Sequence, residues 1–344
     1  AGESWFQLPS TDTSTFYYCQ DMMVHPDTRH LYVCTREGGL MRSKDFGNSW
    51  EQVLALHNGS LVNRASDLEI AANGDLFVSM GVSNSDGIYY SKTGDPASWE
   101  KRMNGFNRSA YYRIEMATAA SDSNVIYAIP EAVGNGGRDS IDAVYRSDDQ
   151  GLNWYTVALP GGNRGLARVQ AWYDLIIKVD PTDPDVVVAG GLNLWRSRDG
   201  GQSWLQLGNG DLRQQSDLQY VHVDQHEVIF QSPDTVYFTN DGGIYKSDNF
   251  TADTPFLYPV NQNYNVTQFY SSAIHPDPGE QLVMGGTQDN GSNRSLTAGI
   301  SDFERVSWAD GGFAEIDHKD PSYWYTTTQF RRLFRQKRSY ICPY

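Results

Sequence analysis

RSDDQGLNW, residues 146–154, is the stretch that decides the fold, because it returns as RSKDFGNSW at 42–50 and as RSRDGGQSW at 196–204. The copies share the pattern Ser-x-Asp-x-Gly-x-x-Trp, which we call the Ser-Asp turn. Serine and aspartate side chains can bond to turn amides, glycine accepts a positive φ, and tryptophan fills an apolar layer. We interpret the repeated positions as structural rather than catalytic. They are Ser43, Asp45, Gly47, Trp50, Ser147, Asp149, Gly151, Trp154, Ser197, Asp199, Gly201 and Trp204.

The repeat has a period of about 50 residues, since a longer copy ends at Trp99, between Trp50 and Trp154. Each unit opens on a short apolar strand, and a turn then leads into a second strand rich in β-branched and aromatic residues. The opening strands cover residues 21–24, 67–70, 113–116, 176–179, 227–230, 271–274 and 313–316. Seven units of this size predict an all-β fold, a seven-bladed β-propeller of four-stranded antiparallel blades.

The two ends of the chain predict how this ring closes. Residues 4–8 have the pattern of a fourth strand, and residues 323–326 and 332–335 have the pattern of inner strands of the seventh blade. One blade shared by the N- and C-terminal strands would close the ring without a free sheet edge. We expect residues 1–344 to form a single propeller domain, either alone or as part of a longer secreted protein.

Composition and charge narrow the class of partner. The 344 residues are 39% hydrophobic, which suffices for a core, and carry a net charge of −15, which argues against nucleic acid and anionic membranes as partners. No apolar run has the length of a membrane helix, so we expect no membrane insertion. The start at Ala1 and six Asn-x-Ser/Thr sequons favour a secreted, extracellular or cell-surface protein.

The cysteines are Cys19, Cys34 and Cys342. If Val24 pairs with Arg29 across a hairpin, Cys19 and Cys34 face each other, and we expect a disulfide between them. The alternative is that both are small buried apolar residues. Cys342 then either has a free thiol or forms a disulfide with a partner outside this chain.

Four further stretches carry a family resemblance: YDLIIKVDP at 173–181, VHVDQH at 221–226, TNDGGIY at 239–245 and GGTQDNGS at 285–292. With the Ser-Asp turns, they resemble Asp-box (BNR) repeat β-propellers, in particular secreted xyloglucanase-like and sortilin-like bacterial proteins. The resemblance implies the propeller fold. It does not determine the activity, because proteins of this architecture have many different activities. A xyloglucanase-like catalytic aspartate would fall near Glu37. The Arg-Ile-Pro motif of sialidases is replaced by Arg113-Ile114-Glu115, which argues against sialidase activity.

Inner propeller strands line a central channel, so residues just before them should surround its mouth. The candidate catalytic carboxylates there are Asp21, Asp67, Asp174 and Asp224, with Glu37 added by the resemblance. The candidate ligand-binding residues are Trp172, Tyr173, Tyr111, Tyr112, Arg113, Tyr220, Tyr270 and Asp310. Carboxylates beside aromatic rings suit a sugar site. The alternative is that the rings belong to the core and the acids cap turns.

His222, Asp224 and His226 alternate and would share one face of a strand, where they could hold a metal ion. The alternative is that the three residues form a hydrogen-bonded polar ladder. We predict no cofactor, and Ca²⁺ is the ion that an acidic mouth would accept.

Two functions follow from these residues. One is an extracellular module that binds a glycan or a protein, and the other is a xyloglucanase-like glycoside hydrolase that uses two rim carboxylates.

Overall fold

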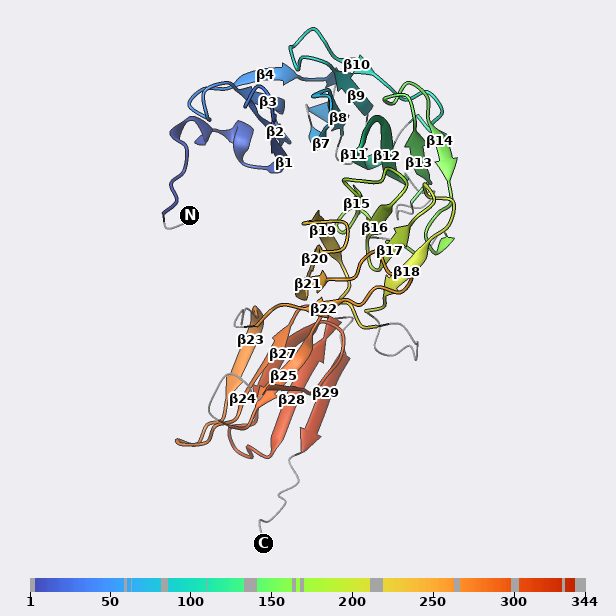
Figure 1. The fold of residues 1–344 in the computed structure, drawn as a ribbon. Helices are drawn as coiled ribbons and strands as arrows, with labels where there is room; N and C mark the ends of the chain where they lie inside the picture. The colour runs from blue at the N-terminus through green and yellow to red at the C-terminus, as the bar shows by residue number, and fades with distance from the viewer. Residues whose placement is uncertain are drawn as a thin grey trace. The chain divides into compact units, whose positions relative to one another are not determined.

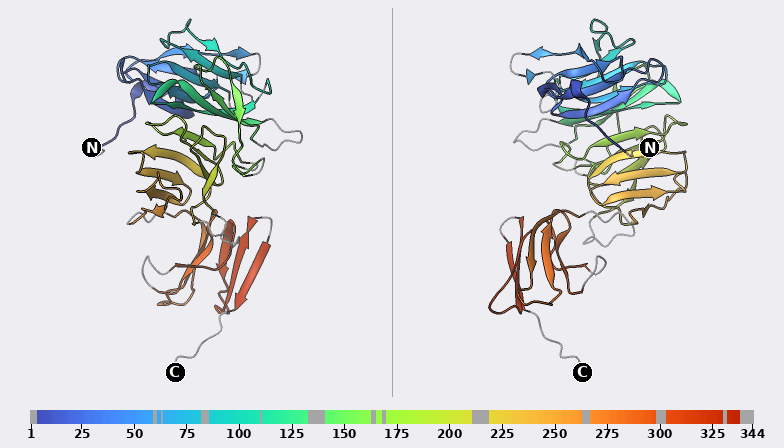
Figure 2. Two further views of the ribbon diagram at one scale, coloured as in Figure 1. Left: turned by 45° about the vertical axis from the view of Figure 1, so that its right-hand side comes forward. Right: turned by 90° about the vertical axis from the view of Figure 1, so that its left-hand side faces the viewer.

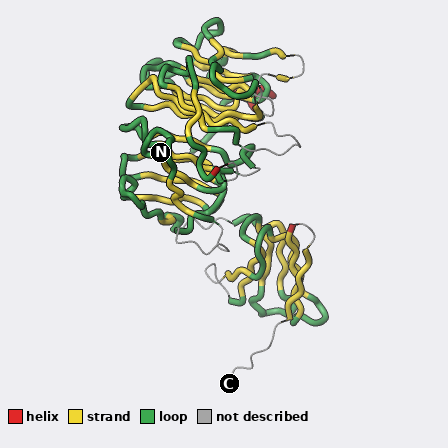
Figure 3. Tube along the Cα trace, turned by 90° about the vertical axis from the view of Figure 1, so that its right-hand side faces the viewer, coloured by secondary structure: helices red, strands yellow, loops and turns green. Residues whose placement is uncertain are grey.

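The computed structural model describes residues 4–58, 61–62, 64–81, 86–109, 111–132, 141–162, 165–167, 170–210, 219–262, 267–297, 303–329 and 332–337. The chain divides into two compact units, residues 1–261 and 262–344, and each is described by itself. The described residues are almost entirely strand and loop, with short 3-10 turns such as Pro9–Thr11 and Ser14–Phe16 (Figure 3). None of the helices in this described part is long and apolar enough to cross a membrane.

Unit 1 contains five antiparallel four-stranded sheets, each built from consecutive strands, and a short two-stranded ribbon (Figure 1). The strands of the five sheets are β1 (Cys19–Val24), β2 (Leu31–Thr35), β3 (Gly39–Ser43), β4 (Glu51–Leu54); β7 (Ala65–Ile70), β8 (Leu76–Met80), β9 (Gly87–Ser91), β10 (Glu100–Lys101); β11 (Tyr111–Ala119), β12 (Asp122–Ala132), β13 (Val144–Ser147), β14 (Tyr155–Val157); β15 (Ile176–Val179), β16 (Val187–Gly190), β17 (Leu194–Ser197), β18 (Leu205–Gly208); and β19 (Gln225–Phe230), β20 (Val236–Asn240), β21 (Gly243–Ser247), β22 (Tyr258–Pro259). The ribbon consists of β5 (His57–Asn58) and β6 (Leu61–Val62).

Unit 2 contains two further antiparallel sheets. Their strands are β23 (Phe269–Ile274), β24 (Val283–Thr287), β25 (Gly291–Ser295) and β26 (Phe303–Arg305), followed by β27 (Gly311–Ile316), β28 (Tyr323–Thr328) and β29 (Arg332–Lys337). Seven consecutive sheets confirm the predicted propeller class. Among the described residues, the seventh sheet has three strands and residues 4–8 form none, so closure of one ring by a shared blade stays a prediction.

All seven predicted opening strands are the first strands of their sheets. In unit 1, the first strands β1, β7, β11, β15 and β19 lie next to one another in that order, on the inner side of an arc of sheets (Figures 1 and 2). Strand-by-strand repetition at a constant period places equivalent residues of successive sheets side by side. The inner side of unit 1 is therefore lined by one strand from each of five sheets.

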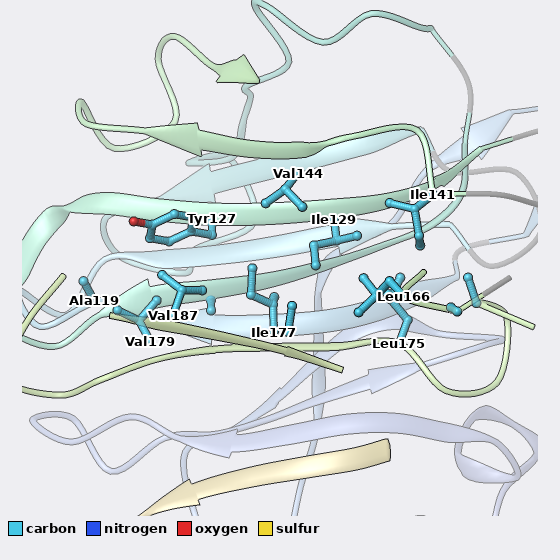
Figure 4. Close-up of a cluster of buried hydrophobic side chains, with 14 of the residues drawn as sticks. Ala119, Tyr127, Ile129, Ile141, Val144, Leu166, Leu175, Ile177, Val179 and Val187 are labelled. Carbon is cyan, nitrogen blue, oxygen red and sulfur yellow. The ribbon is translucent and has the colours of Figure 1, made fainter. Parts of the chain in front are cut away.

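The core of unit 1 consists of apolar layers between consecutive sheets. The layer between the third and fourth sheets is built from residues such as Tyr127, Ile129, Ile177 and Val187 (Figure 4). Equivalent layers separate the other neighbouring pairs of sheets in unit 1, and one more lies between the two sheets of unit 2. The second, third and fourth sheets of unit 1 are therefore covered on both faces, and their second strands, β8, β12 and β16, are almost continuously buried apolar runs.

The three Ser-Asp turns have the same hydrogen bonds. In the second copy, the Ser147 hydroxyl accepts the Gly151 N–H at 2.8 Å, and Asp149 accepts the Asn153 N–H at 2.8 Å. The first and third copies repeat these distances to within 0.1 Å. Gly151 has a φ of 76°, which an L side chain rarely adopts. These bonds end the third strand of each sheet and direct the chain into the fourth.

The tryptophans of the second and third turns reach the preceding sheet, whereas Trp50 of the first turn donates its indole N–H to the Ser10 hydroxyl. Trp154 is 5% exposed and donates its indole N–H to the Arg102 carbonyl at 3.2 Å, while Trp204 donates to the Ala158 carbonyl at 2.7 Å. Both acceptors directly follow the last strand of the sheet before. The turn therefore joins consecutive sheets, in agreement with its structural interpretation.

The predicted disulfide is wrong, because Cys19 and Cys34 are free thiols. The hairpin is longer than expected, with Val24 paired to Leu31, and a β-bulge between Cys19 and Asp21 shifts the register further. Asp21 thus lies opposite Cys34, and Cys19 lies opposite Thr35. Cys34 is a fully buried core residue, as the alternative expected, whereas Cys19 is exposed. Cys342 lies outside the described residues.

Candidate functional site

The inner side of unit 1 holds a cavity of about 500 Å³, lined by residues from all five first strands and from the loop before β15. The sequence-predicted residues that line it are Asp21, Asp67, Arg113, Trp172, Tyr173 and His226. The charged residues that sequence reasoning missed are Glu69, Glu115, Lys178 and Glu227. Glu69 and Glu115 lie two residues after Asp67 and Arg113 on their strands, so the period-2 alternation of a strand would have placed them on the same face.

Asp21 and Asp67 each bond to the neighbouring sheet. The Asp21 carboxylate accepts the Leu68 N–H at 3.0 Å, and the Asp67 carboxylate accepts the Met116 N–H at 2.7 Å. Burial raises the pKa of both carboxyls, and for Asp67 the nearby Glu115 and Asp21 raise the pKa further. Each of these residues therefore has a structural role between sheets besides lining the cavity.

Two acids of the cavity are paired with its two permanent cations. Glu69 lies 3.8 Å from the Lys178 ammonium and accepts the Thr118 hydroxyl at 2.9 Å. Glu115 forms an ion pair with Arg113. Burial raises the pKa of both glutamates, and the neighbouring cation in each case opposes the rise.

Arg113 lines the cavity, but its guanidinium forms hydrogen bonds with backbone carbonyl groups of the protein. It donates to the carbonyls of Ala171 at 3.4 Å, Trp172 at 3.2 Å and Leu175 at 3.3 Å. These carbonyls belong to the loop that carries the aromatic residues before β15. Arg113 thus holds that loop against the third sheet.

The rim of the cavity carries two exposed rings and a histidine that contacts a carboxylate. Trp172 is 65% exposed, and its ring lies 5.6 Å from that of Tyr173. The Tyr173 hydroxyl donates to Asp241 at 3.1 Å, and His226 Nε2 lies 2.6 Å from the same carboxylate. Asp241 is a site residue that the sequence analysis quoted within TNDGGIY but did not single out. Its contacts fix Tyr173 and His226 at the rim.

Asp174 and Asp224 form a buried carboxyl pair behind this rim. Gln170 donates to both through Nε2, at 3.1 Å to Asp174 and at 2.6 Å to Asp224. Burial, together with the Asp224 charge, raises the pKa of Asp174 to about 9. Burial also raises the pKa of Asp224. At neutral pH the pair therefore shares one proton, and neither acid lines the cavity.

Two sequence-based interpretations are wrong. Tyr111 is 1% exposed and packs in the layer between the second and third sheets, so its ring cannot contact a ligand at the mouth. His222, Asp224 and His226 do not share a strand face, because β19 begins at Gln225 and Asp224 has a φ of 64°. His222 is buried with Nδ1 at 3.0 Å from the Val223 carbonyl oxygen, and His226 contacts Asp241 instead.

The other predicted residues lie away from this cavity. Glu37 is exposed in the turn between β2 and β3, and neither Tyr112 nor Tyr220 is among the described residues that line the cavity. Tyr270 and Asp310 belong to unit 2, where they line a separate hollow of about 420 Å³ together with the exposed Phe313.

Comparison with known proteins supports the fold. No protein-family model and no curated protein matches the chain. A GH74 enzyme of Niastella koreensis is similar in structure, with a TM-score of 0.60, 15% identity, and coverage of 92% of this chain and 48% of that one. A GH74 xyloglucanase of Xanthomonas campestris matches with a TM-score of 0.38 and 17% identity, over 90% of this chain and 51% of that one. YCF48 of Cyanidioschyzon merolae matches with a TM-score of 0.45 and 14% identity, over 97% of this chain and 98% of that one.

At 15% identity, the similarity to the Niastella koreensis enzyme shows a shared fold alone. The chain spans about half the length of the two GH74 structures. Their activity is therefore a property of longer proteins, and any function of this chain has to be argued from its own site.

Proposed function

We propose that the chain is a glycan-binding β-propeller module whose binding site is the cavity of unit 1. The observation that carries the proposal is the exposed pair Trp172 and Tyr173 at the rim of a cavity lined by carboxylates. An indole and a phenol ring stack on the C–H face of a sugar, and carboxylates accept its hydroxyl groups. A volume of about 500 Å³ is in the range of small-ligand sites.

The contacts of the carboxylates favour binding over hydrolysis. Glycosidases place two free carboxyl groups about 5 to 9.5 Å apart across the scissile bond. Here Asp21 and Asp67 each hold a backbone amide of the next sheet, and Asp174 and Asp224 are buried behind the rim. Asp21 and Asp67 therefore serve contacts between sheets as well as the cavity, and Asp174 and Asp224 do not line it, which favours binding over a xyloglucanase-like mechanism.

We further propose that the module belongs to the Asp-box propellers and acts outside the cell. The support is the hydrogen-bonded Ser-Asp turn, which recurs with the same distances in three sheets. Under this proposal, the partner is an extracellular glycan, presented free or on a protein, and no cofactor takes part.

Binding of a panel of soluble oligosaccharides by isothermal titration calorimetry tests the proposal. We expect Trp172→Ala and Tyr173→Ala to lower the affinity of the best ligand about tenfold or more, because stacking area is lost. Phe256→Ala is a matched control, since Phe256 is 60% exposed but does not line the cavity. Equal affinity in all three variants would place the site elsewhere. Shortened products on incubation with the same panel would establish the hydrolase instead.

A further inference from the structure

The cavity of unit 1 holds more negative charge than its own cations neutralise. Lys178 lies beside Glu69 and Arg113 pairs with Glu115. Asp21, Asp67 and Glu227 also line the cavity, and none of them forms a salt bridge with another described residue. Three acidic side chains of the cavity thus lack a salt-bridge partner among the described residues, and the Lys178 ammonium is the cation that they share with Glu69 at longer range.

Asp67 leaves one of these carboxylate oxygens available to a ligand. The residue is 8% exposed, and its Oδ2 accepts the Met116 N–H at 2.7 Å. Its Oδ1 has no hydrogen-bond donor among the described residues, although the side chain lines the cavity. Because this oxygen is not one of the buried polar atoms that lack a partner among the described residues, it is accessible from the cavity, and a ligand that donates hydrogen bonds can reach it.

We propose that the cavity binds a protonated primary amine carried by an amino-sugar unit of the glycan. The inference rests on the proposed glycan-binding function and names its ligand class. The sugar ring stacks on Trp172 and Tyr173 at the rim, and its ammonium group enters the cavity toward Asp67. An ammonium group offers three N–H donors and a positive charge, which match the carboxylate oxygens that face the cavity.

The electrostatics of the carboxylates support this ligand class. Burial and then the like charges of Glu115, Asp21 and Glu69 hold the pKa of Asp67 well above its usual range. A cation in the cavity would reduce this repulsion, a neutral sugar would leave it unchanged, and a sulfated or uronic sugar would increase it.

A metal ion fits the cavity less well than an organic cation. Calcium requires six to eight oxygen ligands at about 2.3 to 2.6 Å from the ion. Within the part of the chain that the structure describes, no three carboxylates lining the cavity bring one oxygen each within 4.8 Å of one another. The charge is spread over a volume of about 500 Å³, which suits a ring with an amine substituent.

Calorimetry with three β-1,4-linked tetramers, of glucosamine, N-acetylglucosamine and glucose, tests the inference. We expect the glucosamine tetramer to bind at least about tenfold more tightly than the two neutral tetramers. This preference should shrink as salt is added, since it depends on charge. Asp67→Asn keeps an acceptor for the Met116 amide and should reduce the preference to about threefold or less.

A second variant and a control complete the experiment. Glu227→Gln removes an exposed cavity carboxylate and should also reduce the preference, even if Asp67→Asn fails to fold. Asp277→Asn, which removes an exposed carboxylate in unit 2, should leave the preference unchanged. Equal binding of neutral and amino tetramers, or Ca²⁺ binding without amine binding, would overturn the inference while leaving the glycan site intact. Failure of all three tetramers to bind, with no binder in the wider panel, would reject the proposed function itself.

Discussion

Arg113 Nη1 donates a hydrogen bond to the Trp172 carbonyl oxygen at 3.2 Å, and this bond links the first strand of the third sheet to the loop before the fourth. The same guanidinium reaches the carbonyls of Ala171 and Leu175, so one side chain holds both ends of the segment that carries the rim aromatics. Arg113 was predicted to contact a ligand. Its contacts instead make it a positioning residue for Trp172 and Tyr173.

The first prediction follows from this contact. We expect Arg113→Met, made together with Glu115→Gln so that no buried charge is left unpaired, to weaken glycan binding about tenfold. In a Trp172→Ala background the same change should weaken binding less than it does in the parent protein, because one of the two rings that Arg113 positions is already gone. Titration calorimetry of the four combinations measures this coupling. Additive losses would show that Arg113 acts on the ligand independently of the loop.

The second prediction concerns the tryptophan of the Ser-Asp turn. Trp154→Ala should lower the free energy of unfolding by about 3 to 5 kcal/mol, since it empties a packed layer between two sheets. Trp172→Ala should change it by no more than about 0.5 kcal/mol, because Trp172 is exposed. Urea unfolding monitored by circular dichroism measures both variants. Equal stability of the two variants would reject the structural interpretation of the turn.

The third prediction concerns the buried serine of the same turn. Ser147 is 0% exposed, and its hydroxyl accepts the N–H groups of Asp149 and Gly151. Ser147→Ala leaves the buried Gly151 amide without an acceptor, so we expect a loss of about 1 to 3 kcal/mol. Ser43→Ala and Ser197→Ala should give similar losses, because their turns have the same bonds. Thermal unfolding of the three variants would contradict the repeat interpretation if only one of them lost stability.

The fourth prediction uses the carboxyl pair behind the rim. Burial and the Asp224 charge raise the pKa of Asp174 to about 9, against about 3.9 in an unfolded chain. Between these values the folded chain holds a proton that the unfolded chain has released, so stability falls as pH rises, by at most about 1.4 kcal/mol per pH unit. Asp174→Asn should remove this slope and raise the melting temperature at pH 8 more than at pH 4.

The control for this pH series is an exposed acid outside the pair. Asp277→Asn should leave the shape of the stability curve unchanged, since its carboxylate is solvated. The assignment of the shared proton would be wrong if the parent protein and Asp174→Asn showed the same dependence of melting temperature on pH.

Much of the site could be located from the sequence, and the errors have identifiable causes. Asp21, Asp67, Trp172 and Tyr173 were placed correctly on the cavity because they lie within the first strands or in the loop before one, and the apolar pattern of these strands is local. Tyr111 was misplaced because its ring packs between two sheets, where its hydroxyl lies 3.5 Å from that of Tyr145, 34 positions further along the chain. The prediction that His222 and His226 share a strand face was wrong because Asp224, which lies between them, has a positive φ and so does not continue an extended strand.

The sequence by itself determined the repeating unit, the first strand of each sheet and the turn that joins consecutive sheets. These depend on interactions over a few residues, such as the bonds from Ser147 to Gly151, and a fixed period then copies them along the chain. Only the tertiary structure decided register and charge pairing. One bulge moved Cys19 away from Cys34, and packing of β7 against β11 brought Asp67 to the Met116 amide. The contact of Asp67 joins residues 49 positions apart, so its geometry depends on how whole sheets pack, and the bulge depends on how two strands pair, rather than on any local pattern.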